Sequence, residues 1–163
     1  MPEKRTVGRA KRAKRQAKAP STQAGEFVRE EMHHIREGEH GARSTKQGIA
    51  IGLSKARRAG VDLRPPKKGR VSEKTRRSAE RAYAAGQRRA PKASRRRSQA
   101  TKGALKRERR SAASRKELSK QARSAARKRR PAERSASAKR AARTKGRRGR
   151  SAAARKAART RRR

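Results

Sequence analysis

The residues best suited to chemistry lie together in one short stretch, EFVREEMHHIREGEHG, at positions 26–41 (the Glu/His segment). This segment holds five of the chain's twelve acidic residues and all three of its histidines. Imidazole and carboxylate groups are ordinary ligands of Zn²⁺ and the usual general acids and bases of enzymes. Their spacing decides whether they can converge on one ion or one substrate.

The spacing within the Glu/His segment favours surface ion pairs over a metal site. On a helix His34 would follow Glu30 by four residues, and Glu37 would follow His33 by four, so each pair shares a face. The adjacent residues His33 and His34 diverge by about 100° and cannot both ligate one ion there. We therefore expect surface Glu–His pairs, with no metal site and no cofactor.

No arrangement typical of an active site accompanies this segment. The sequence has no pair of carboxylates that can be assigned to a pocket, and ARSTK at 42–46 lacks the glycine–lysine order of a phosphate-binding P-loop. The chain has no cysteine, so it has no thiolate nucleophile or disulfide. We expect a protein that is not an enzyme.

The rest of the chain is a polycation with little apolar material. Its formal net charge is +44, 42% of its residues are charged and 1% are aromatic. Residues 21–61 hold seven Lys/Arg against five Glu, whereas residues 62–163 hold forty-one against six. Such a composition hides too little apolar surface to offset chain entropy, so we expect an all-α chain that is largely disordered.

The ordered part is expected to be a short helical hairpin over about residues 21–60. The first helix would be capped by Ser21 or Thr22, and its apolar arc is interrupted only by Glu31. Gly38 and Gly41 mark the turn, and the second helix would begin at Ser44 or Thr45 and end near Gly60. The side chains expected to pack in this hairpin are Phe27, Val28, Met32, Ile35, Ile49 and Leu53.

Small residues recur at every fourth position of the second helix, at Gly48, Gly52, Ala56 and Gly60. Because interior glycine costs about 1 kcal/mol relative to alanine, this pattern indicates close approach of another helix, within or between chains. The alternative is simply a weak helix. A hairpin with so few apolar side chains is marginal alone, so a homodimer through residues 21–61 is one expected solution.

Basic segments flank the hairpin on both sides. Residues 1–20 form an N-terminal arm, 62–71 a Pro/Lys linker, 72–90 a short helix, and 91–163 a tail rich in Ala, Arg, Lys and Ser. Within the tail SASAKRAARTKGR (135–147) recurs as SAAARKAARTRRR (151–163). We expect these arms to become helical when a bound polyanion neutralises the repulsion between like charges at i,i+4.

Nucleic acid is the partner that this charge predicts. Membrane-lying helices need bulky apolar side chains on one face, which the basic segments lack, so we expect no membrane association. Sequence-specific binding of single strands needs aromatic platforms, which are nearly absent. The residues expected to bind phosphate are Arg127, Lys128, Arg129, Arg130, Lys139, Arg140, Arg143, Arg147, Arg148, Arg155, Lys156, Arg159, Arg161, Arg162 and Arg163.

Residues 20–65, which include STQAGEFVREEMHHIREGEHGARSTKQGIAIGLSKARRAG, resemble a family of small basic bacterial proteins that share a domain of unknown function. The tail is similar to those of bacterial histone-like proteins. The resemblance implies a bacterial source and no known catalytic residues, and it supplies no function. From the charge we expect a protein of the bacterial cytoplasm, associated with the nucleoid, that compacts or protects DNA. Two alternatives stay open: association with RNA or ribosomes, and an adaptor whose hairpin docks a DNA-processing protein.

Overall fold

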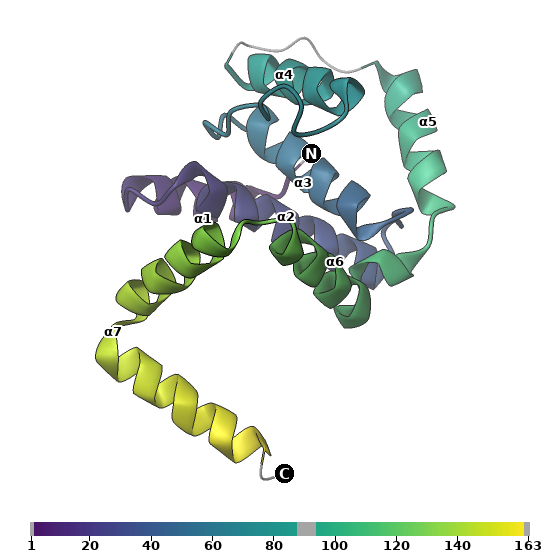
Figure 1. The fold of residues 1–163 in the computed structure, drawn as a ribbon. Coiled ribbons are helices and arrows are strands. Elements are labelled where there is room, and N and C mark those ends of the chain that lie inside the picture. The colour runs from purple at the N-terminus through teal and green to yellow at the C-terminus, as the bar shows by residue number, and fades with distance from the viewer. Residues whose placement is uncertain (1, 88–93, 162–163) are drawn as a thin grey trace. The chain divides into compact units, whose positions relative to one another are not determined.

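The computed structural model describes residues 2–87 and 94–161, apart from the side chain of residue 97. Of these residues 77% are helical and none is in a strand. The chain divides into two units, Met1–Ser119 and Lys120–Arg163. The helices, coloured along the chain in Figure 1, are α1 (Lys4–Arg15), α2 (Pro20–Glu37), α3 (Thr45–Arg58), α4 (Glu73–Gln87), α5 (Arg95–Lys106), the 3-10 helix η1 (Arg110–Ala113), α6 (Arg115–Arg127) and α7 (Pro131–Arg161).

The all-α prediction is confirmed, but two finer expectations are wrong. The described chain is mostly well-ordered helix and not disordered, and its fold is larger than a short hairpin. Alanine, arginine and lysine have high intrinsic helix propensity, and this propensity prevails over like-charge repulsion along the basic segments.

Helices α2 and α3 form the centre of the first unit and pack against each other. Helix α2 ends at Gly38, which adopts a left-handed conformation with φ 84°. Ser44 caps α3, as predicted, by accepting a hydrogen bond from the backbone N–H of Gln47. Neither Ser21 nor Thr22 caps α2, because that helix already begins at Pro20, whose fixed φ suits a first helical position.

The small residues of α3 serve a contact within the chain. A Cβ atom at position 52 would lie 2.7 Å from Cα of Val28 and 3.1 Å from the carbonyl oxygen of Phe27, both on α2. At position 48 it would meet Cε of Met32 at 2.7 Å. The absence of these Cβ atoms lets the two helix backbones approach closely, which explains why glycine occupies the interior of this helix.

Alanines from the flanking segments complete the core around this hairpin. Phe27 is fully buried in a first cluster that includes Ala10 of α1 and Ala56 of α3. Ile35 is fully buried in a second cluster that includes Ala112 and Ala113 of η1. The flanks therefore supply the apolar surface that the hairpin lacks, which removes the reason for expecting it to dimerise. A homodimer stays a prediction.

Residues 105–113, expected to belong to the basic tail, are part of the first unit. The backbone N–H of Gly41 donates to Leu105 O at 2.8 Å, and that of Ala42 donates to Arg109 O at 3.0 Å. The hydroxyl of Thr45 donates to Ala112 O at 2.6 Å. These bonds attach the segment to the α2–α3 turn through its backbone.

The second unit is dominated by α7. No residue of this helix is buried. Gly146 (φ 63°, ψ 177°) interrupts the helical backbone, and the ribbon changes direction there (Figure 1). None of the helices within residues 2–87 or 94–161 is long and apolar enough to cross a lipid bilayer.

Candidate nucleic-acid interface

The predicted phosphate-binding residues lie at the end of α6, in the segment that follows it, and along α7. Arg127 ends α6, Lys128–Arg130 connect the two helices, and the described remainder lies on α7. All of those described are exposed. Arg162 and Arg163 lie outside the described residues. Across residues 120–163 the sequence holds twenty Lys/Arg against a single Glu, so this unit is a nearly pure polycation.

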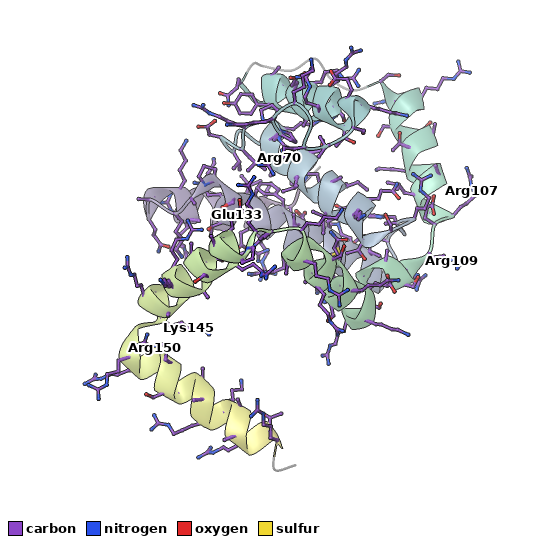
Figure 2. All side chains as sticks on the ribbon, in the orientation of Figure 1. Arg70, Arg107, Arg109, Glu133, Lys145 and Arg150 are labelled. Carbon is purple, nitrogen blue, oxygen red and sulfur yellow. The ribbon has the colours of Figure 1, made fainter. Side chains whose placement is uncertain are left out.

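Residues 135–145 of the first sequence repeat lie on the half of α7 before Gly146, and residues 151–161 of the second lie on the half after it. Thr144 Oγ1 donates to Arg140 O at 3.0 Å, and Thr160 Oγ1, sixteen residues later, donates to Lys156 O at the same 3.0 Å. Each half spans about 22 Å at 1.5 Å per residue. Figure 2 shows side chains such as Lys145 and Arg150 standing out from the ribbon. Cations therefore recur at corresponding positions of the two repeats, at 139, 140, 143 and 145 and again at 155, 156, 159 and 161.

A second cationic surface lies on α1 and was not singled out from the sequence. Arg5, Arg9, Arg12 and Arg15 line a shallow hollow of about 420 Å³ beside Gly8. Their spacing of four, three and three residues places all four on one helix face. This spacing can be read from the sequence and could have identified the surface. We name these four residues the α1 arginine row.

The α1 arginine row is held in place by contacts with α2. Nε of Arg9 lies 2.9 Å from Oε2 of Glu26. Nη2 of Arg9 also donates to Thr6 Oγ1 at 3.0 Å, and Thr6, Ala10 and Ala13 of the same helix are buried. The row is therefore carried by a helix with a fixed inner face, whereas α7 has no inner face at all.

Two other arginines serve the fold. Arg57 is 7% exposed and its Nε donates to Leu63 O at 3.0 Å; burial lowers the pKa of its guanidinium. Arg36 Nε donates to Ala113 O at 2.9 Å. Because these groups bond to backbone carbonyls, we exclude them from the candidate interface.

One histidine of the Glu/His segment forms the surface pair that the sequence predicts, and the other two do not. His33 is exposed and pairs with Glu37 at 2.9 Å, as expected. His34 is buried and its Nε2 lies 3.1 Å from Glu3 Oε1 of the N-terminal segment. His40 Nε2 lies 3.3 Å from Oε1 of the fully buried Glu31. The fold thus encloses part of this segment.

The chain matches no protein-family model, no curated protein and no solved structure. What the fold and surface define is a class: an all-helical polycation with one packed helical unit and one exposed cationic unit. Membership of the family suggested by residues 20–65 stays a prediction.

Proposed function

We propose that this protein binds nucleic acid without sequence preference, with duplex DNA as its main ligand. The observation that carries the proposal is α7, which has no buried residue. The net charge of residues 120–163 comes from twenty cations and one carboxylate. A helix without a buried residue, and rich in cations and alanine, suits a polyanion.

Electrostatics makes this binding broad. Duplex DNA carries one negative charge per about 1.7 Å of helix axis, and neutralising its phosphates releases condensed counterions. Guanidinium groups grip phosphate oxygens in a bidentate way. Phosphate contacts orient a protein on the duplex but carry no sequence information. The chain has one Phe, one Tyr and no Trp, so stacking on unpaired bases contributes little.

Each unit carries its own cationic surface, the α1 arginine row in the first and α7 in the second. A chain with two such surfaces can engage two stretches of duplex at once. Joining two duplexes, or two parts of one, compacts DNA and shields it from nucleases. We therefore propose compaction or protection of the bacterial nucleoid as the biological role.

The test is equilibrium binding of the full chain to matched 30-nucleotide ligands at 150 mM salt: duplex DNA, single-stranded DNA and structured RNA. We expect two unrelated duplex sequences to bind with the same Kd within about twofold, and the duplex to compete successfully with both other ligands. Stronger binding of structured RNA would contradict the DNA proposal and favour RNA or ribosome association. Absence of binding to all three would favour the adaptor alternative.

A further inference from the structure

Three side chains of the Glu/His segment converge at the turn after α2. Glu31, His34 and His40 each offer one ligand atom, and these atoms all lie within 4.8 Å of one another. Glu31 is fully buried, His34 is 8% exposed, and His40 is half-buried. Two come from α2 and the third from the turn, which residues 105–113 hold in place.

The hydrogen bonds of His40 determine which of its nitrogens is free. Its Nδ1 lies 3.0 Å from the carbonyl oxygen of Gly41, which can only accept, so Nδ1 carries the proton. In the neutral ring, Nε2 then presents a lone pair. That nitrogen lies 3.3 Å from Oε1 of Glu31. Two electron-rich atoms therefore face each other unless a proton or a metal ion lies between them.

His34 shows the same arrangement. Its Nε2 lies 3.1 Å from the carboxylate of Glu3 and donates to it. Its Nδ1 then presents the lone pair, and that atom lies 3.6 Å from Oε2 of Glu39. A histidine that donates one ring N–H to a carboxylate and leaves the other nitrogen free to bind is the usual arrangement for a metal-ligating imidazole.

Glu31 completes the set. Lys55 Nζ lies 2.6 Å from its Oε2 and forms an ion pair with it. Neither oxygen of this carboxylate has a hydrogen-bond partner in the part of the chain that the structure describes. A buried carboxylate oxygen without a hydrogen-bond donor is unfavourable, because it has lost its hydration without replacement. A cation placed among Oε1 and the two imidazoles would remove this cost.

We propose that Glu31, His34 and His40 bind one divalent transition ion of the Zn²⁺ class. Two imidazoles and one carboxylate form a known three-ligand set for Zn²⁺, which leaves one position for water or for Glu39. Mg²⁺ and Ca²⁺ prefer oxygen ligands and do not suit two imidazoles. A net charge of +44 opposes adventitious cation binding elsewhere on the chain.

The proposal departs from the sequence-based expectation of no metal site. That expectation rested on the divergence of His33 and His34, which the structure shows as one exposed and one buried side chain. The ion proposed here uses His34 with His40, which the turn at Gly38 brings back toward α2. This inference is independent of nucleic-acid binding.

The test is a titration of ZnCl₂ into the untagged, EDTA-treated full chain by calorimetry, without nucleic acid. We expect one Zn²⁺ per chain, unaffected by excess Mg²⁺. His34→Gln and His40→Gln should each weaken binding at least tenfold. The matched control His33→Gln, which alters the exposed histidine beside the site, should leave the affinity unchanged. Equal weakening by all three variants, or no saturable binding, would overturn the proposal.

A second measurement uses the unaltered protein and so does not depend on how the variants fold. Co²⁺ bound by two imidazoles and a carboxylate in low coordination gives visible bands that are much stronger, and lie at longer wavelength, than the weak band of hydrated Co²⁺. We expect these bands in the wild type and in His33→Gln, together with a rise in Tm when Zn²⁺ is added. Spectra that match the free ion would count against the site.

Discussion

Nζ of Lys55 on α3 lies 2.6 Å from Oε2 of Glu31, whose side chain is completely buried on α2. Glu31 is the residue that interrupts the apolar arc of α2, and its partner lies on the other helix of the hairpin. An unpaired buried carboxylate is costly, so this contact favours one particular register between the two helices.

Removing both members of this pair should destabilise the protein by less than the two single removals added together. Lys55→Met leaves the buried carboxylate without its strongest partner and should cost about 3 kcal/mol of unfolding free energy. Glu31→Gln with Lys55→Met should cost less than the sum of the two single changes, by at least about 0.5 kcal/mol. Urea denaturation in EDTA, followed by circular dichroism, measures this cycle; additive effects would show that the pair is not coupled.

The contact between α2 and α3 predicts opposite effects for two glycine substitutions. In Gly52→Ala the new Cβ would lie 2.7 Å from Cα of Val28, so the backbones must separate. We expect destabilisation of about 1–3 kcal/mol, as for other overpacked cores. Gly25→Ala, on α2 with no atom within 4 Å of the new Cβ, is the matched control. It should stabilise by up to about 1 kcal/mol through helix propensity. Equal stabilisation by both substitutions would refute the close approach.

Tyr83 provides a pH prediction that one spectroscopic signal can report. Its hydroxyl donates to Asp62 Oδ1 at 2.6 Å, and this hydrogen bond raises the pKa of Tyr83 above its ordinary value of 10.0. Because the chain has one tyrosine and no tryptophan, absorbance at 295 nm follows this group alone.

The protonated tyrosine is the form that the fold favours. Its contribution to stability should therefore be complete below pH 10.0 and disappear as pH rises through the elevated pKa. Asp62→Asn should move the titration midpoint down toward the ordinary value. An unchanged midpoint in that variant would mean that the hydrogen bond does not form in solution.

The recurrence of cations in the two repeats of α7 predicts that corresponding positions contribute equally to DNA binding. Positions 139 and 143 correspond to positions 155 and 159 in the repeats. The double variant Lys139→Gln/Arg143→Gln should lower the log–log salt slope by up to about 1.8. Arg155→Gln/Arg159→Gln should lower the slope by the same amount, because it also removes two cations. Glutamine is the replacement because its helix propensity is close to that of lysine and arginine. Fluorescence anisotropy over a salt series checks this, and a large difference between the two would argue against equal contributions.

The hairpin was predictable because its signals are local. Gly38 and Ser44 mark helix ends through their own conformations and side chains, and Phe27 and Ile35 follow helical periodicity. The attachment of η1 was not predictable, because much of it consists of backbone hydrogen bonds such as that from Ala42 to Arg109 O. Composition alone assigns alanine little apolar surface, so the burial of Ala10 and Ala113 was not predictable. They are core residues because they belong to the clusters of the larger side chains Phe27 and Ile35 on α2.

The candidate sites divide in the same way. The cations of α7 were predictable from charge density. The α1 arginine row needed only its spacing to be noticed. The convergence of His40 with Glu31 depends on how the turn folds back, and no spacing rule within one helix contains that information.

The most direct test of the account compares the salt dependence of duplex binding by the full chain and by a chain ending at Arg130. This boundary keeps the first unit and α6 intact while removing α7. Ten engaged cations would give the full chain a log–log slope near −9. We predict a slope of about that size for the full chain. For the shortened chain we predict a much shallower slope and weaker binding to every duplex sequence. Identical slopes and affinities for the two chains would contradict the account.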